Sequence, residues 1–216
     1  MEKYSYANES SMNNQLALGY YSGVVHKKHV ESYGEAGAKN IHQNIVETYQ
    51  QIQKKLESTN NKNVLLVGKV QSGKTSNLEL LTALAFDNGY NVLVIYGGYD
   101  TSLLKQTTDR FRETFDAIGE ISFDGKAPAI FHTSDNNTPI EGINHEIMDD
   151  LFDYNKPIIF VSMKRPAAMR KINKLLKNID RSKLKAFIID DEGDQASLNT
   201  AKDKIRDASA TYKQIK

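Results

Sequence analysis

The sequence predicts an α/β domain with a mostly parallel sheet flanked by helices, preceded by a small, mostly helical N-terminal region. Beyond residue 60, five short apolar runs alternate with segments of helical periodicity. The runs are continuously apolar, which is typical of parallel strands buried on both faces. Residues 1–60 are rich in Asn, Ser, Tyr and Gln and contain no such run. We therefore expect an appendage over residues 1–60 and an α/β domain over residues 61–216.

The appendage has one clear helical segment, residues 38–56. Apolar residues recur there at helical spacing, as at Ile41, Ile45 and Tyr49, and a polar cluster at residues 58–61 ends the segment. In the α/β domain, the expected strands cover residues 64–67, 92–96, 129–131, 157–161 and 186–189. The expected helices cover residues 76–86, 103–118, 143–152 and 167–176, and a polar helix follows from residue 199.

The composition is that of an ordinary globular protein. The chain has 216 residues and a formal net charge of +1, so its bulk charge does not indicate a nucleic-acid binder. It has no run of about 18 apolar residues that could span a membrane. It also lacks the apolar segment of a signal peptide, and it has no cysteine for disulfides or thiolate zinc sites. We expect a cytoplasmic protein that makes no contact with a membrane.

A phosphate-binding loop follows the first expected strand. Residues 68–75 fit the pattern G-x-x-x-x-G-K-[ST] at every fixed position, with a strand before and a helix after. In such a loop, backbone N–H groups and the helix dipole surround the phosphates. Lys74 would reach the β and γ phosphates of ATP, and the Thr75 hydroxyl would bind Mg²⁺. The expected ATP-binding residues are Gly68, Lys69, Val70, Gln71, Ser72, Gly73, Lys74, Thr75 and Ser76.

An acidic cluster follows the last expected strand, at residues 190–194. The carboxyl ends of parallel strands are where ligands bind in open α/β sheets. One carboxylate at such a place can hold magnesium, and the next can orient the attacking water. A turn built from Asp and Gly is the alternative, but it does not account for several adjacent acids directly after four apolar residues.

These motifs together resemble a known family. Asp191-Glu192-Gly193-Asp194 looks like the D-E-A-D box of superfamily-two helicases, with Gly in third place. Residues 67–77, 87–90 and 190–197 resemble the helicase-like ATPase part of bacterial proteins that carry the Z-one endonuclease domain. The resemblance covers residues 62–216 and implies a RecA-like P-loop NTPase. It further implies a two-lobed ATPase motor on nucleic acid, DNA favoured over RNA, in bacterial anti-phage defence.

The resemblance also implies roles for single residues. Lys74 and Glu192 would be catalytic, and Thr75 and Asp191 would bind magnesium. The residues implied to contact the nucleic-acid backbone are Gly97, Gly98, Gln106, Lys164 and Arg165. The last two begin a basic stretch, residues 164–185, which has nine Lys or Arg and a single acid. That stretch could meet phosphates or could form solvated helix faces.

The resemblance implies a second motor lobe that supplies an arginine, and no such lobe follows in these 216 residues. We expect the chain to be the first, incomplete lobe of a larger protein, with weak ATP hydrolysis or none by itself. The main alternative is a regulatory or signalling P-loop ATPase switch without strand translocation. A small-substrate kinase is less favoured because no lid insertion is evident.

Three histidines in the appendage could suggest a metal site. His26 and His29 are spaced to share one helix face, and His42 follows on the next segment. The sequence offers no cysteine pattern and no carboxylate close to them. It therefore favours a surface position for these histidines over a metal site.

Overall fold

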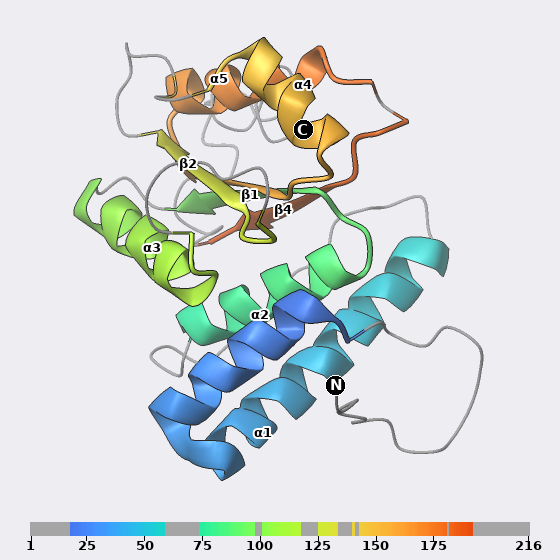
Figure 1. Cartoon of the computed structure of the whole chain (residues 1–216), viewed down its shortest axis with the longest axis vertical. Coiled ribbons are helices and arrows are strands. Elements are labelled where there is room, and N and C mark those ends of the chain that lie inside the picture. The colour runs from blue at the N-terminus through green and yellow to red at the C-terminus, as the bar shows by residue number, and fades with distance from the viewer. Residues whose placement is uncertain are drawn as a thin grey trace, which may run out of the picture. The chain divides into compact units, whose positions relative to one another are not determined.

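The computed structural model describes residues 18–58, 74–97, 101–117, 125–133, 140, 143–180 and 182–191 (Figure 1). The chain divides into two compact units, Met1–Gly89 and Tyr90–Lys216. The sequence predicts an appendage over residues 1–60 and an α/β domain over residues 61–216. The first helix after the phosphate loop instead belongs to the same unit as the N-terminal helices, because it packs against them.

In the described residues, the first unit has two helices, α1 (Tyr20–Ser58) and α2 (Lys74–Asp87). The helix expected over residues 38–56 is confirmed and extends back to Tyr20. A kink at Gly34 divides α1 into two arms that lie side by side (Figure 1). Gly34 has φ 69°, a positive value that glycine adopts without the steric cost of a Cβ atom. The buried side chains of this unit include Val25, Tyr49 and Leu80.

The start of α1 is capped by the last residue of α2. The Asp87 carboxylate accepts hydrogen bonds from the backbone N–H groups of Gly19, Tyr21 and Ser22, at 2.9, 3.0 and 2.9 Å respectively. The first N–H groups of a helix lack partners within the helix, and a negative charge there also complements the helix dipole. This contact joins the two helices of the unit at one end.

In the part of the chain that the structure describes, the second unit has a four-stranded sheet in which all strand pairs are parallel, in the order β2-β3-β1-β4. The strands are β1 (Val92–Gly97), β2 (Ala129–Thr133), β3 (Ile158–Met163) and β4 (Ala186–Asp190). These elements confirm the expected parallel sheet and four of its strands. The strand expected over residues 64–67 and the helix expected from residue 199 lie outside the described residues.

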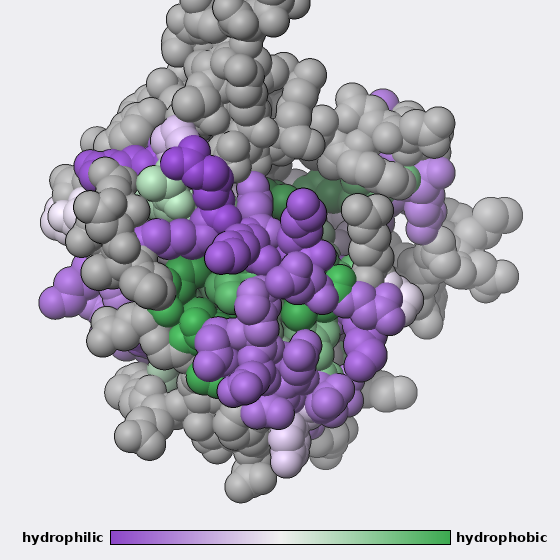
Figure 2. All heavy atoms as spheres, turned by 90° about the horizontal axis from the view of Figure 1, so that it is seen from above, coloured by the Kyte–Doolittle hydropathy of each residue, from purple (hydrophilic) through white to green (hydrophobic). Residues whose placement is uncertain are grey.

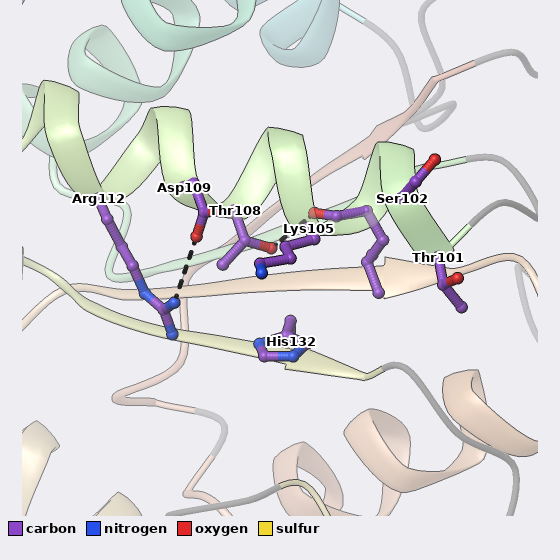
Figure 3. A pocket seen from close by; sticks show the side chains of 8 residues that line it. Thr101, Ser102, Lys105, Thr108, Asp109, Arg112 and His132 are labelled. Carbon is purple, nitrogen blue, oxygen red and sulfur yellow. Dashed lines mark hydrogen bonds and ion pairs between the residues drawn. The ribbon is translucent and has the colours of Figure 1, made fainter.

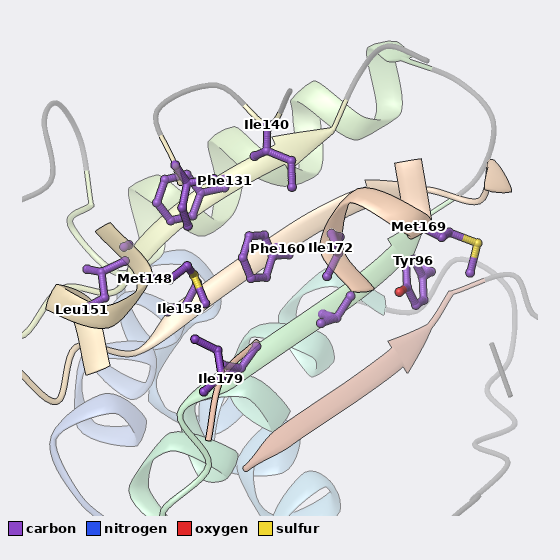
Figure 4. Close-up of a cluster of buried hydrophobic side chains, with 14 residues drawn as sticks. Tyr96, Phe131, Ile140, Met148, Leu151, Ile158, Phe160, Met169, Ile172 and Ile179 are labelled. Atoms are coloured by element: carbon purple, nitrogen blue, oxygen red, sulfur yellow. The ribbon is translucent and has the colours of Figure 1, made fainter. Parts of the chain in front are cut away.

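Three helices accompany the sheet, namely α3 (Thr101–Thr114), α4 (His145–Asp153) and α5 (Pro166–Lys177), and all three match expected helices. Side chains from α4 and α5 pack with alternate residues of β1, β2 and β3 in one buried cluster (Figure 4). Phe160 is fully buried there, and its ring stacks near that of Phe131 at 5.8 Å between centroids. Helix α3 contacts β2 and β3, and Figure 1 shows it on the side of the sheet away from α4 and α5.

The edge strand β4 differs from its neighbours in burial. Every residue of β3 is buried, as the continuous apolar runs predicted, whereas the residues of β4 are half-buried or exposed. Ile188, in the middle of β4, is 57% exposed. The prediction of strands buried on both faces therefore holds for β3 and nearly all of β1, but not for β4. No helix in the described ranges is long and apolar enough to cross a membrane.

Candidate functional site

Residues 68–73 of the phosphate loop lie outside the described residues, and so do Gly98 and Glu192. What is described is the helix that follows the loop. Helix α2 begins at Lys74, directly after the last glycine of the motif, although the Lys74 side chain is outside the described part. The first turn of α2 contains no acidic residue, so no carboxylate there opposes an anion at the positive end of the helix dipole.

Two hydroxyl residues occupy that first turn of α2. Thr75, the expected magnesium ligand, is half-buried, and Ser76 is buried. The Ser76 hydroxyl lies 2.8 Å from the hydroxyl of Tyr33, on the first arm of α1. This hydrogen bond ties the start of α2 to α1, a link that the sequence did not suggest.

The acidic cluster begins at the carboxyl edge of the sheet. Asp190 is the last residue of β4, and Asp191 follows it. The Asp191 N–H donates to the carbonyl oxygen of Tyr96 at 2.9 Å, so the backbone pairing of β4 with β1 continues into the acidic run. Both carboxylate residues are half-buried. The edge position of these two acids is what the sequence predicted for them.

Lys164 provides a charge partner for the first of these acids. It follows β3 directly, it is fully buried, and its Nζ lies 2.6 Å from Oδ1 of Asp190. The two atoms are close but poorly aligned for a hydrogen bond, so we describe the contact as an ion pair. The sequence assigned Lys164 to nucleic acid. Its ammonium is instead buried against a carboxylate of the same sheet, where a nucleic-acid phosphate does not reach it.

Further polar groups line the same edge. Burial, and then the negative charge of Asp190, raise the pKa of Tyr96 to about 12, so its phenol stays neutral at physiological pH. Between the ends of β2 and β3, the hydroxyls of Thr133 and Ser162 lie 2.6 Å apart in a buried hydrogen bond. The carboxyl ends of the four strands thus carry hydroxyl, ammonium and carboxylate groups on an otherwise apolar sheet.

The other residues expected to contact nucleic acid lie on separate elements. Gly97 ends β1, Gln106 is exposed on α3, and Arg165 is half-buried just before α5, where its side chain makes no capping hydrogen bond.

A groove of about 390 Å³ lies between α3 and β2 (Figure 3). Lys105 and Arg112 reach into it from α3, and His132 faces it from β2. Arg112 also forms an ion pair with Asp109 at 3.6 Å. Sequence reasoning missed Arg112 and His132, because only the packing of α3 on β2 brings them together. The remaining lining residues are Thr101, Ser102, Leu104 and Thr108.

The basic stretch at residues 164–185 does not form a uniformly positive surface. The end of α5 lies near the start of α4, where the Asn178 amide is 3.3 Å from the His145 ring. Lys183 pairs with Asp153 at 3.4 Å. Hydrophilic residues cover most of the described surface on this side, with hydrophobic ones visible between them (Figure 2). This mixture of charges favours solvated helix faces over a continuous phosphate-binding surface.

Two of the three histidines of the first unit, His29 and His42, are buried and His26 is half-buried, so the surface position expected from the sequence was wrong for His29 and His42. His29 and His42 are 3% and 4% exposed, and the ring of His42 lies edge-on to those of His26 and His29. The two arms of α1 fold the rings together, and Glu79 of α2 lies 3.5 Å from His29. No three metal-binding side chains of the described ranges are arranged to hold a metal ion. The cluster is therefore a packed polar core.

A magnesium ion bound together with a nucleotide does not need three protein side chains as ligands. Mg²⁺ is usually held by one or two protein oxygens together with waters and substrate phosphates. The half-buried Asp191 and the hydroxyl residue Thr75 are of the chemical kind that this mode requires.

The described fold and edge chemistry define an α/β protein with an all-parallel four-stranded sheet and carboxylates at its carboxyl edge. Comparison of the chain with protein-family models, with curated proteins and with solved structures finds no match. The family resemblance read from the motifs therefore stays a hypothesis.

Proposed function

We propose that this chain is the ATP-binding lobe of a helicase-type P-loop ATPase with a RecA-like fold, which acts on nucleic acid. The observation that carries the proposal is the complete phosphate-loop pattern, whose last two residues, Lys74 and Thr75, begin α2. A second feature supports it, because the acids that such an ATPase needs come at the carboxyl end of a parallel strand, β4.

In the proposed site, each residue has one role. Backbone N–H groups of residues 68–76 and the Lys74 ammonium bind the phosphates of ATP. Thr75 and Asp191 bind the magnesium ion, which neutralises charge on the phosphates when it is present. Glu192 accepts a proton from the attacking water. Lys74 and Glu192 are thus the proposed catalytic residues.

Nucleic acid is the proposed substrate of the motor, with DNA favoured. The groove between α3 and β2 supports this part, because Lys105, Arg112 and His132 offer donors to backbone phosphates beside the exposed Gln106. Arg165 is a further proposed contact. A second motor lobe, in the same protein or in a partner, would complete the ATP site with an arginine. A cytoplasmic role in bacterial defence is part of the proposal and rests on the resemblance of the motifs alone.

The test is ATP hydrolysis with and without single-stranded and double-stranded DNA and RNA, for the chain together with its second lobe. Hydrolysis that nucleic acid stimulates and that Lys74→Ala abolishes would support a motor. ATP binding without any effect of nucleic acid would instead favour a regulatory ATPase switch. A chain that binds no nucleotide would overturn the proposal.

A further inference from the structure

Lys164 and Asp190 come from strands that are not neighbours. Strand β1 lies between β3 and β4, so the backbones that carry the two residues are roughly 10 Å apart, two strand spacings. Lys164 immediately follows β3, and Asp190 ends β4. The long, flexible lysine stem spans this gap past the end of β1 and brings Nζ to 2.6 Å from the carboxylate.

The burial of Lys164 shows that its position is specific. Lysine is almost never fully buried unless its charge is paired, because removing an ammonium group from water costs several kcal/mol. Lys164 is 0% exposed, whereas the side chain of Asp190 retains 25% exposure. An exposed lysine pairing in solvent would be of little consequence, but a buried one fixes the side chain of its partner.

The position of Asp190 also affects Asp191, the next residue of the acidic run. Backbone pairing continues through the N–H of Asp191 to Tyr96, so the chain is still held against β1 at this residue. The ion pair therefore commits the Asp190 carboxylate to Lys164, while the backbone hydrogen bond to Tyr96 holds Asp191 directly after it at the carboxyl edge of the sheet.

We infer that Lys164 is a positioning residue of the proposed ATP–magnesium site. Through its ion pair with Asp190, it withholds that carboxylate from the metal and fixes Asp191 as the carboxylate that binds magnesium. The inference rests on the proposed function and deepens it, because it assigns a role to the first acid of the run. Lys164 itself contacts neither the nucleotide nor the metal in this arrangement.

The experiment measures the affinity of the chain for a non-hydrolysable ATP analogue by calorimetry, once with Mg²⁺ and once with EDTA. The ratio of the two affinities reports magnesium coordination, whereas the affinity in EDTA reports the phosphate loop. In Lys164→Met, the ratio falls roughly ten- to a hundredfold, as is usual when a group that orients a metal ligand is removed. The affinity in EDTA stays at the parent value, which a general loss of structure would not allow.

Two further variants keep the test decisive. Lys183→Met is the matched control, because it removes the lysine of the exposed pair with Asp153 in the same unit, and it keeps the parent ratio. If Lys164→Met does not fold, the double variant Lys164→Met/Asp190→Leu replaces both charges by apolar groups, a change that buried ion pairs often tolerate. Circular dichroism establishes that the double variant is folded, and its ratio falls as in the single variant.

Two sets of results would overturn the inference. A parent ratio in the folded single or double variant means that Lys164 has no part in positioning Asp191. A ratio that rises in Lys164→Met means that Asp190, once released, is itself a magnesium ligand. Failure of the proposed function is distinct from both, because the parent chain would then bind no nucleotide, and the inference would fall with it.

Discussion

Nε2 of His29 lies 3.5 Å from Oε2 of Glu79, and both side chains are almost completely buried. The contact joins the first arm of α1 to α2, and the ring of His42 from the second arm of α1 packs edge-on to His29 at 5.4 Å between centroids. Three segments of the first unit therefore meet at titratable groups. The stability of this unit should depend on the protonation state of that cluster.

The first prediction concerns acid sensitivity. Burial, and then the charges of His26 and His29, lower the pKa of His42 from 6.5 to about 3. Burial also lowers the pKa of His26, with Glu35 acting in the opposite direction. The unfolded chain therefore binds a proton on His42 between pH 6.5 and about 3 that the folded chain does not bind, and the lowered pKa of His26 acts in the same direction. Stability should be full above pH 6.5 and should decline as the pH falls from 6.5 toward 3.

The expected loss of stability can be calculated one pH unit below the ordinary histidine pKa of 6.5. At pH 5.5, His42 alone should lower the free energy of unfolding by up to about 1.4 kcal/mol relative to pH 7.5. Thermal unfolding at the two pH values measures the loss. His42→Leu should reduce the pH dependence, whereas His145→Gln, in the second unit, should leave it intact. An unchanged pH dependence in His42→Leu would show that His42 is not the group responsible.

The second prediction concerns the phosphate loop. Lys74→Ala removes the one side-chain cation at a fixed position of the motif, and a hydrogen bond to a charged group contributes about 1.5–3 kcal/mol. ATP affinity should therefore fall roughly ten- to a hundredfold in a titration with a fluorescent ATP analogue. Lys69→Ala is the matched control, since Lys69 stands at a variable position of the same loop and should matter only through its backbone. Equal losses in both variants would contradict the motif assignment.

The third prediction distinguishes the proposed roles of Asp191 and Glu192. Asp191→Asn should weaken the magnesium-dependent part of nucleotide binding, because an amide is a poorer ligand for a hard cation than a carboxylate. Glu192→Gln should leave binding intact and lower turnover by about 10²- to 10⁴-fold, because an amide does not accept the proton of water. Asp194→Asn serves as the control in the same acidic run. Parent turnover in Glu192→Gln would place the general base elsewhere.

The fourth prediction concerns the groove between α3 and β2. If it binds backbone phosphates, Lys105→Ala and Arg112→Ala should each weaken DNA binding to a similar degree for all sequences. Each should also reduce the slope of log affinity against log salt by about 0.9, since one phosphate contact is lost. Fluorescence anisotropy with labelled DNA at several salt concentrations gives this slope. Lys54→Ala, an exposed lysine of α1, should leave it unchanged.

Much of the fold was predictable because its signals are local. The runs at residues 92–96 and 157–161 are continuously apolar, and the structure has strands β1 and β3 there. Helix α5 starts at Pro166, whose fixed φ suits a first helical position, and ends near residue 177 as expected. Neither the part of α1 before residue 38 nor its kink at Gly34 was predicted, because a single glycine does not reveal whether a helix ends, bends or continues there.

The sequence by itself determined the kinds of element, their order along the chain, and the two motifs on which the proposed function rests. Only the tertiary structure decided which charged groups meet. The strand order β2-β3-β1-β4 sets the ends of β3 and β4 on either side of β1, and so Lys164 reaches Asp190 instead of solvent. The same holds for His42, which the fold of α1 buries against His26 and His29. Periodicity along a chain reports which face of an element is apolar, but the choice of neighbours is made by long-range packing, which no local pattern encodes.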